Sequence, residues 1–314
     1  IGNTLMVGCC RDHRCDPLTS RNSKLIHKIL TGLTGLSLTL ALTSCGSGGI
    51  EIENKGSDTL LEVAASLAQA YGDLHPEIAI SVSGGGSGGG IASLIGGDLD
   101  IANSSRALKP KEIEEANKRN IKPQDHVVGW DGIAIFVHKE NPIESLTLAQ
   151  LKAMFADGGK IENWTDIGID FGTGDADNNI VLVSRQNSSG TYECFLNKVL
   201  GKGSRFKARC NNLNSSKDVV DLCTKSKSAI GYSGLAYATD DVRVVPIISA
   251  EGKPAILPSI DTVLDRSYGI SRPLYMYTNE GCSKEISDYL DWIKGPAGQK
   301  VMLEEGYVPL VKPK

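Results

Sequence analysis

The chain alternates short β-branched apolar segments with longer segments of helical apolar spacing from residue 50 to its end. Clear examples are the strand-like segments 78–83 and 127–137 and the helix-like segment 284–294. Alternation of this kind is typical of open α/β sheets with mostly parallel strands. In such sheets, ligands bind at the carboxyl ends of strands, in the loops that begin the following helices. The sequence therefore predicts an α/β fold and directs attention to these loops.

Bulk composition narrows the classes of function. Hydrophobic residues make up 40% of the 314 residues and charged residues 22%, as in ordinary soluble globular proteins. The sequence contains no block of like charges, so nucleic acid is not expected as a partner. The 35 glycines come in short bursts between the periodic segments, which indicates specific turns rather than a disordered chain.

The N-terminal segment has the features of an export signal. Ile29–Leu42 is an apolar run without charges that is too short for an ordinary membrane span. It leads into Leu42-Thr43-Ser44-Cys45, which resembles a bacterial lipobox. We therefore expect removal of residues 1–44, lipidation of Cys45 and a flexible linker over residues 45–49. Three basic residues precede the apolar run: Arg21, Lys24 and Lys28.

A plain signal peptide that ends near a cysteine would give the same N-terminal pattern. Residues 1–20 match neither a signal nor a domain, so the start codon is undetermined, and so is the choice between inner and outer membrane. Removing residues 1–44 leaves 28 Lys and Arg against 35 Asp and Glu, a net charge of −7. An acidic protein can still bind an anion when dipoles and one or two Arg supply local positive potential.

Four cysteines follow Cys45, and export to an oxidising compartment makes disulfides among them possible. Four cysteines allow three pairings, and the sequence does not choose among them. Their spacings match no metal-binding motif, so we expect no metal and no cofactor. The four are Cys194, Cys210, Cys223 and Cys282.

Three segments rich in Ser, Thr and Gly each follow a predicted strand and precede a predicted helix: Gly56–Thr59, Gly84–Gly90 and Ser188–Thr191. Free N–H groups at a helix start favour an anion, and hydroxyls can donate to it. Ordinary helix capping would explain the first segment equally well. Because the segments lie far apart in the sequence, the fold must bring them together, and a two-lobed cleft would do so.

The middle segment is the least ordinary of the three. Six of the eight residues Ser83–Gly90 are glycine, and each glycine costs roughly 0.5–1 kcal/mol relative to Ala in regular structure. A binding loop would carry that cost so that a ligand can approach main-chain N–H groups. A flexible surface turn is the alternative, but the strand before the segment and the helix after it favour a binding loop.

Two arginines accompany these segments. Arg185 precedes Ser188–Thr191, and its planar guanidinium suits a tetrahedral oxyanion. A surface Arg before a capped helix would give the same pattern. Arg106 ends the polar segment Asp100–Arg106, where it would face the ligand or pair with Asp131. The sequence does not choose between these two roles.

Taken together, several sequence motifs resemble those of a known family. The chain resembles the PstS-type phosphate-binding component of an ABC transporter over about residues 50–310. The resemblance implies a two-lobed type II periplasmic binding-protein fold in which each lobe is a mixed, mostly parallel sheet flanked by helices. Lobe 1 would contain residues 50–130 and 240–314, and lobe 2 residues 131–239. The motifs are Gly56-Ser57-Asp58-Thr59-Leu60, Gly84-Gly85-Gly86-Ser87-Gly88, Asp100-Ile101-Ala102-Asn103-Ser104-Ser105-Arg106, Arg185-x-x-x-Ser189-Gly190-Thr191 and Ala229–Tyr237.

The resemblance also implies a function. The chain would capture inorganic phosphate outside the cytoplasmic membrane and deliver it to the permease subunits of an ABC transporter, as a lipid-anchored monomer without catalytic activity. Chain crossings near Gly129–Asp131 and Thr239–Val242 would act as hinges. Asp131 and Asn187 would support the ligand contacts. The ligand-binding residues carried over by motif or expected from their segments are Ser57, Asp58, Thr59, Ser87, Ser105, Arg106, Arg185, Ser189, Gly190 and Thr191.

One departure from the family pattern concerns selectivity. Some members have an Asp at the position of Ser105, and that Asp accepts the phosphate proton. Those members have no carboxylate in the first loop, where this chain has Asp58. We interpret Asp58 as the displaced acceptor. Sulfate offers no proton, so a buried carboxylate repels it and remains unpaired, and an unpaired buried group costs about 1–3 kcal/mol or more.

Three alternative functions fit parts of the sequence. Gly85-Gly86-Ser87-Gly88-Gly89 satisfies the G-x-S-x-G pattern of a serine hydrolase, but only His75, His126 and His138 follow the signal segment, at poor positions for a triad. A binding protein for sulfate or molybdate is the second alternative, against which Asp58 argues. A sensor lipoprotein that keeps the fold without transport is the third.

Overall fold

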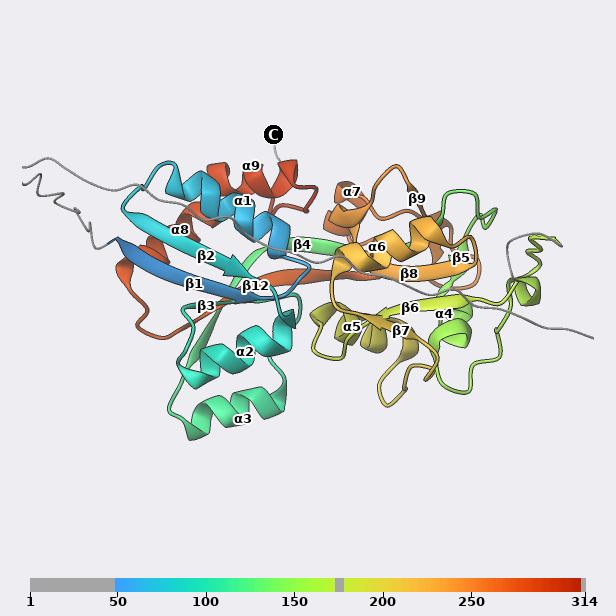
Figure 1. The fold of residues 1–314 in the computed structure, drawn as a ribbon, viewed down its shortest axis with the longest axis horizontal. Helices are drawn as coiled ribbons and strands as arrows, with labels where there is room; N and C mark the ends of the chain where they lie inside the picture. The colour runs from blue at the N-terminus through green and yellow to red at the C-terminus, as the bar shows by residue number, and fades with distance from the viewer. Residues whose placement is uncertain (1–48, 173–177, 312–314) are drawn as a thin grey trace, which may run out of the picture. The chain divides into compact units, whose positions relative to one another are not determined.

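The longest strand, β4 (Pro123–His138), joins two parts of one nine-stranded sheet. Its first part pairs with β12 (Ser271–Asn279) up to Gly132, and from Ile133 it pairs with β8 (Ala229–Gly234). Both pairings are antiparallel, and so is the pairing of β12 with β3 (Ile101–Ser104). Farther out, β1 (Ile50–Gly56) is parallel to β2 (Ile78–Ser83) and β3, and β6 (Val181–Arg185) is parallel to β7 (Asn211–Leu213) and β8. The sheet order is β2-β1-β3-β12-β4-β8-β6-β7, with β9 (Val242–Val244) also paired to β4 (Figure 1).

The computed structural model describes residues 49–172 and 178–311. The expected signal segment, the lipobox and Cys45 lie outside these residues. Among the described residues, no helix has both the length and the apolar character needed to cross a membrane. The strands are β1 (Ile50–Gly56), β2 (Ile78–Ser83), β3 (Ile101–Ser104), β4, β5 (Leu146–Thr147), β6 (Val181–Arg185), β7 (Asn211–Leu213), β8, β9 (Val242–Val244), β10 (Ile247–Ile248), β11 (Ala255–Ile256) and β12. The helices are α1 (Leu61–Gly72), α2 (Gly86–Gly96), α3 (Pro110–Lys118), α4 (Leu148–Phe155), η1 (Trp164–Ile167), α5 (Gly190–Phe195), η2 (Leu196–Leu200), α6 (Ser216–Lys225), η3 (Leu235–Tyr237), α7 (Ile260–Leu264), α8 (Lys284–Lys294) and α9 (Pro296–Glu304).

Helices cover both faces of each part of the sheet (Figure 1). Around β1, β2 and β3, helices α1, α8 and α9 lie on one face and α2 and α3 on the other. Around β6 and β8, α6 lies on one face and α4 and α5 on the other. The apolar side chains between these layers form separate clusters, such as Leu67 with Tyr289 and Phe155 with Phe195. This burial of apolar surface provides most of the free energy that holds the layers together.

The expected α/β alternation is confirmed. Strand 78–83 and helices 110–118, 148–155 and 284–294 begin and end at the residues that periodicity predicts. The glycine segment differs from its prediction, because Gly86–Gly90 form the first turns of α2 rather than a loop. Sequence periodicity does not reveal the short elements, among them β7 and α7, since they contain too few residues for a period to show.

The predicted lobe boundaries stay a prediction. The packing supplies one relevant observation: β9 pairs with the second part of β4. Val245 and Ile270 are buried in the same cluster as Ile133. The segment from β9 to Ile270 therefore packs with the second part of the sheet, although the family resemblance assigns it to lobe 1.

The four cysteines of the described residues are free thiols. Cys194, Cys210 and Cys223 are buried, and Cys282 is partly exposed. Burial raises the pKa of the Cys210 thiol to about 11 and that of Cys223 to about 12. These two thiols are therefore protonated at neutral pH and are poor nucleophiles.

Candidate functional site

The three Ser/Thr/Gly segments meet at the carboxyl ends of parallel strands, as the sequence predicts. Ser57–Thr59 follow β1, and Ser105 follows β3. Ser87 lies in the first turn of α2, after β2, and Ser189 is the N-cap of α5, after β6. Strands from both parts of the sheet thus direct short polar segments toward one place.

A cluster of hydroxyl groups forms where these segments meet. The Ser57 hydroxyl donates to the Ser105 hydroxyl at 2.9 Å, and the Ser87 and Ser105 hydroxyl oxygens lie 3.3 Å apart. The Thr59 and Thr191 hydroxyl oxygens lie 2.7 Å apart. All five side chains are at most 2% exposed. Buried hydroxyls with so few other partners are suited to donate to an anion that would replace their contacts with one another.

Glycine allows this close approach. A Cβ on Gly190 would lie 2.4 Å from the Ser105 hydroxyl oxygen and 2.6 Å from that of Ser87. Gly86 has φ +79°, and a Cβ there would meet the Ser188 carbonyl oxygen at 3.0 Å. The Ser188 carbonyl in turn accepts a hydrogen bond from the Gly88 amide at 3.0 Å. We expected the glycines to admit a ligand; they also allow the first turn of α2 to contact the turn before α5.

Asp58 is held by groups from two other segments. Its Oδ1 accepts from the Gly85 amide at 3.2 Å, and its Oδ2 accepts from Arg185 Nη2 at 3.2 Å. Arg185 is fully buried and also donates to the Ser216 hydroxyl and the Asn214 carbonyl. Burial lowers the pKa of Arg185, against the attraction of Asp58; the guanidinium nevertheless stays charged at neutral pH.

Sequence reasoning missed a second buried arginine, Arg272 on β12. Its Nη2 donates to Thr191 Oγ1 at 2.9 Å and to Thr59 Oγ1 at 3.2 Å, and its Nη1 donates to the Ser105 carbonyl at 3.1 Å. Asp131 Oδ2 accepts from Arg272 Nη2 at 2.8 Å and from Nε at 3.1 Å. The segment Ser271-Arg272-Pro273-Leu274-Tyr275 also resembles the PstS family, and this resemblance could have indicated Arg272. Periodicity could not, because an isolated Arg within a strand has no periodic signal.

Asp131 contacts the hydroxyl cluster through Arg272, so its ion-pair partner is Arg272 rather than Arg106. Burial raises the pKa of the Asp131 carboxyl, and the charge and hydrogen bonds of Arg272 oppose this shift. Arg106 instead forms a two-point ion pair with Glu112, at 2.8 Å and 2.6 Å. Asn187 is exposed in the turn before α5.

The contacts of Ser87 give no hydrolase geometry among the described residues. Its hydroxyl contacts Ser105, whereas His75 lies 3.3 Å from Glu77 and His126 lies 3.0 Å from the Thr278 hydroxyl. His138 accepts from the Glu140 amide. The three histidines are thus engaged elsewhere.

The fold and the site define a class: a solute-binding protein with buried oxyanion donors on strand ends from two parts of an α/β sheet. Comparisons with known proteins agree. The family model of the PBP superfamily domain matches residues 43–296. The phosphate-binding protein PstS of Pseudomonas aeruginosa is 33% identical over 271 residues, which cover 82% of this chain and 83% of that protein. The PstS of Staphylococcus aureus is 33% identical over 293 residues, 88% and 86% of the two chains.

Solved structures show the same relationship. A substrate-binding protein of a putative phosphate ABC transporter from Clostridium perfringens, solved with bound phosphate, has a TM-score of 0.73 at 28% identity and covers 83% of this chain and 100% of its own. An ABC-type phosphate transport receptor from Vibrio cholerae has a TM-score of 0.64 at 27% identity, with 82% and 99% covered. The chain belongs to the PstS family of phosphate-binding proteins within the PBP superfamily.

Proposed function

We propose that this protein captures inorganic phosphate outside the cytoplasmic membrane and delivers it to an ABC transporter permease. The observation that carries the proposal is the buried hydroxyl cluster, in which Thr59 and Thr191 both accept from Arg272. Buried donors that are fixed in place bind an oxyanion without having to be ordered first. Two relatives are named phosphate-binding proteins and a third was solved with bound phosphate, which supports phosphate as the anion.

Selectivity for phosphate depends on Asp58 in this proposal. Each of its carboxylate oxygens accepts one hydrogen bond, so each has a lone pair left for a phosphate hydroxyl. Sulfate has no proton to donate at neutral pH and would meet only charge repulsion there. The two arginines, Arg185 and Arg272, offset the charge of the bound anion and of the carboxylates.

Ligand capture would be coupled to closure of the two parts of the sheet. Thr59 at the start of α1 and Thr191 in α5 approach each other only when these parts are close. Lys109 adds a second connection, because its ammonium lies 2.8 Å from Glu193 Oε2 on α5. We place one hinge where β4 changes partner after Gly132. We place the other where β12 begins at Ser271 rather than at the expected Thr239–Val242, because the segment from β9 to Ile270 packs with the second part of the sheet.

The protein would act by binding alone, without covalent chemistry, and it would be a monomer held at the membrane by a lipid on Cys45. Mass spectrometry of the protein from its native membrane would find a diacylglyceryl group on Cys45. A mature chain that starts at any other residue would contradict the anchor, without bearing on phosphate binding.

Calorimetric titration of the delipidated mature chain tests the function. Phosphate and arsenate are expected to bind with a stoichiometry of one, because both carry an acidic hydroxyl at neutral pH. Sulfate and molybdate, which lack it, are expected to bind at least 100-fold more weakly. No binding of phosphate at millimolar concentration would contradict the proposal, and tighter binding of sulfate or molybdate would identify another oxyanion as the ligand.

A further inference from the structure

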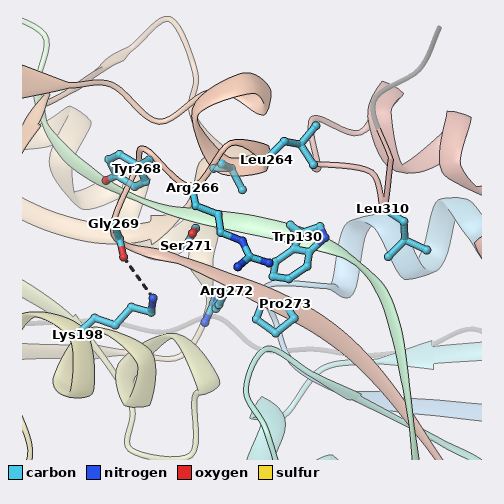
Figure 2. Close-up of a pocket in the computed structure, with 11 residues that line it drawn as sticks. Trp130, Lys198, Leu264, Arg266, Tyr268, Gly269, Ser271, Arg272, Pro273 and Leu310 are labelled. Carbon is cyan, nitrogen blue, oxygen red and sulfur yellow. Dashed lines mark hydrogen bonds between the residues drawn. The ribbon is translucent and has the colours of Figure 1, made fainter.

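A cavity of about 550 Å³ lies beside the start of β12 (Figure 2). Arg272 belongs to both places: it lines this cavity and it donates to Thr59 and Thr191. The other lining residues come from β12 itself, β4, η2, α7, the loop after α7 and the C-terminal segment. They are Trp130, Lys198, Val263, Leu264, Arg266, Tyr268, Gly269, Ser271, Pro273 and Leu310.

The charge of this cavity is positive. Among the described residues that line it, three are cations and none is Asp or Glu. Asp131 offsets the charge of Arg272, so Lys198 and Arg266 carry the excess. In the described part of the chain, no carboxylate oxygen lies within 4.0 Å of either of these two cations. Both side chains are exposed, so they are accessible to a dissolved ligand, and together they produce a local positive potential that attracts anions.

The backbone holds Arg266 in an uncommon conformation. Its φ is +64°, and Asn120 is the other non-glycine residue with positive φ in the described chain. This conformation costs an L-residue such as Arg roughly 1–2 kcal/mol. In Figure 2 the Arg266 side chain extends across the cavity toward Trp130, and Lys198 reaches the Gly269 carbonyl from the opposite side, at 3.2 Å. The two cations thus face one space from two sides.

Most of the other lining residues are apolar or aromatic. Leu264, Pro273 and Leu310 contribute aliphatic surface, and Trp130 contributes an indole ring. The volume falls in the range of pockets that bind small organic molecules, which combine an apolar lining with a few polar groups. An inorganic ion would satisfy the two cations but would leave this apolar lining uncovered.

We propose that this cavity is a second anion site, which binds a small organic phosphate monoester through Lys198 and Arg266 and its aromatic or aliphatic part through Trp130, Leu264 and Pro273. The guanidinium of Arg266 offers the planar pair of donors that fits a phosphoryl group. Lys198 supplies a second positive charge from the other side. The site is separate from the hydroxyl cluster, from which the buried side chain of Arg272 divides it.

The test is a calorimetric titration of the full chain with phenyl phosphate after one equivalent of inorganic phosphate has filled the hydroxyl cluster. We expect one phenyl phosphate per chain, weaker binding of the monoanion benzoate, and no binding of phenol. Loss of the phenyl phosphate signal with this single equivalent of inorganic phosphate present would show that the probe uses the hydroxyl cluster, which overturns the proposal. Equal binding of phenol would also overturn it, because charge would then have no role.

Two variants locate the site. Arg266→Gly removes the charge and relieves the positive φ, so the loop keeps its conformation. Lys198→Gln removes the second charge. Each is expected to weaken phenyl phosphate binding about tenfold, in line with a lost charge-assisted contact. Lys217→Gln, an exposed lysine outside the lining, is the matched control and should leave it unchanged.

Inorganic phosphate binding provides an independent readout. Arg266→Gly and Lys198→Gln should leave the affinity for inorganic phosphate within twofold of the unmodified chain, because neither residue contacts the hydroxyl cluster. Unchanged phenyl phosphate affinity in both variants would place the probe elsewhere and overturn the proposal. If inorganic phosphate does not bind at all, the two variants still test the cavity, since phenyl phosphate is measured directly.

Discussion

The hydroxyl oxygens of Thr59 and Thr191 lie 2.7 Å apart, although 132 residues separate them in the sequence. Each begins or precedes a helix in a different part of the sheet, and Arg272 donates to both. One hydroxyl donates to the other, which leaves one hydroxyl hydrogen free for a ligand. This contact directly connects the two halves of the candidate site.

Removal of either threonine hydroxyl is expected to weaken phosphate binding. Thr59→Val and Thr191→Val keep the side-chain shape and lose one donor, which costs about 1–1.5 kcal/mol or roughly tenfold in affinity. The exposed Thr239→Val is the matched control. Titration calorimetry measures the affinities, and an unchanged affinity in both buried variants would exclude these hydroxyls from the ligand contacts.

Asp58→Asn is expected to change selectivity more than affinity. The variant keeps a carbonyl oxygen for Gly85 but removes the charge opposite Arg185, so the site becomes more positive and no longer repels sulfate. We expect the phosphate-to-sulfate affinity ratio to fall at least tenfold, about 1.4 kcal/mol. Competition titrations with both anions measure this ratio. A ratio equal to that of the unmodified chain would refute the role of Asp58 in selectivity.

Gly190→Ala is expected to abolish tight phosphate binding. Its Cβ would lie 2.4 Å from the Ser105 hydroxyl oxygen, so the hydroxyls have to move apart. Gly89→Ala is the matched control within α2, because its Cβ meets no atom within 4 Å. Ala is the better helix residue by about 1 kcal/mol, so the control should raise the free energy of unfolding and leave binding intact. Tight binding by Gly190→Ala would show that the cluster tolerates a larger separation.

Arg272→Gln is expected to destabilise the fold as well as the site. It leaves the Asp131 carboxylate buried without its ion-pair partner, which costs about 3–5 kcal/mol. The exposed pair Lys284 and Asp288 on α8 is the control, and Lys284→Gln should leave the free energy of unfolding nearly unchanged, because solvent screens this pair. Urea denaturation measures both. A loss below about 1 kcal/mol in Arg272→Gln would mean that Asp131 is satisfied by other groups.

The Lys109–Glu193 pair predicts a pH-dependent contribution to stability. Burial opposes ionisation of Glu193, but the hydrogen bond and charge of Lys109 outweigh it and lower the pKa of this carboxyl. A lowered folded-state pKa stabilises the fold above the unfolded value of about 4.3, and this contribution is lost as pH falls through the folded value. Because both side chains are partly exposed, we expect at most about 1 kcal/mol.

The comparison of Glu193→Gln with the unmodified chain isolates this contribution. The difference in free energy of unfolding should be present at pH 7 and smaller at pH 3, because acid protonates the carboxyl whose lowered pKa is the source of the difference. Asp288→Asn, which breaks an exposed pair within one helix, is the control. A difference that is the same at both pH values would assign the effect of Glu193→Gln to packing rather than charge.

Local sequence patterns predict the elements well where they are long and periodic. The spacing in 284–294 and the Pro at the start of 110–118 give helices α8 and α3 with the predicted bounds. The same reasoning fails at Gly86–Gly90, since the low helix propensity of glycine favours a loop there. Neighbouring strands and the close approach to Ser188 stabilise α2 despite its glycines.

By itself, the sequence determined the α/β class, the family and the polar segments Ser57–Thr59, Ser87 and Ser189–Thr191, because these depend on residue types at short spacings. Only the tertiary structure decided the charge pairing. Arg106 pairs with Glu112, Asp58 with Arg185, and Asp131 with Arg272. Such pairs join residues that are up to 141 positions apart in the sequence. The charge of a side chain does not indicate which distant residue the fold places next to it.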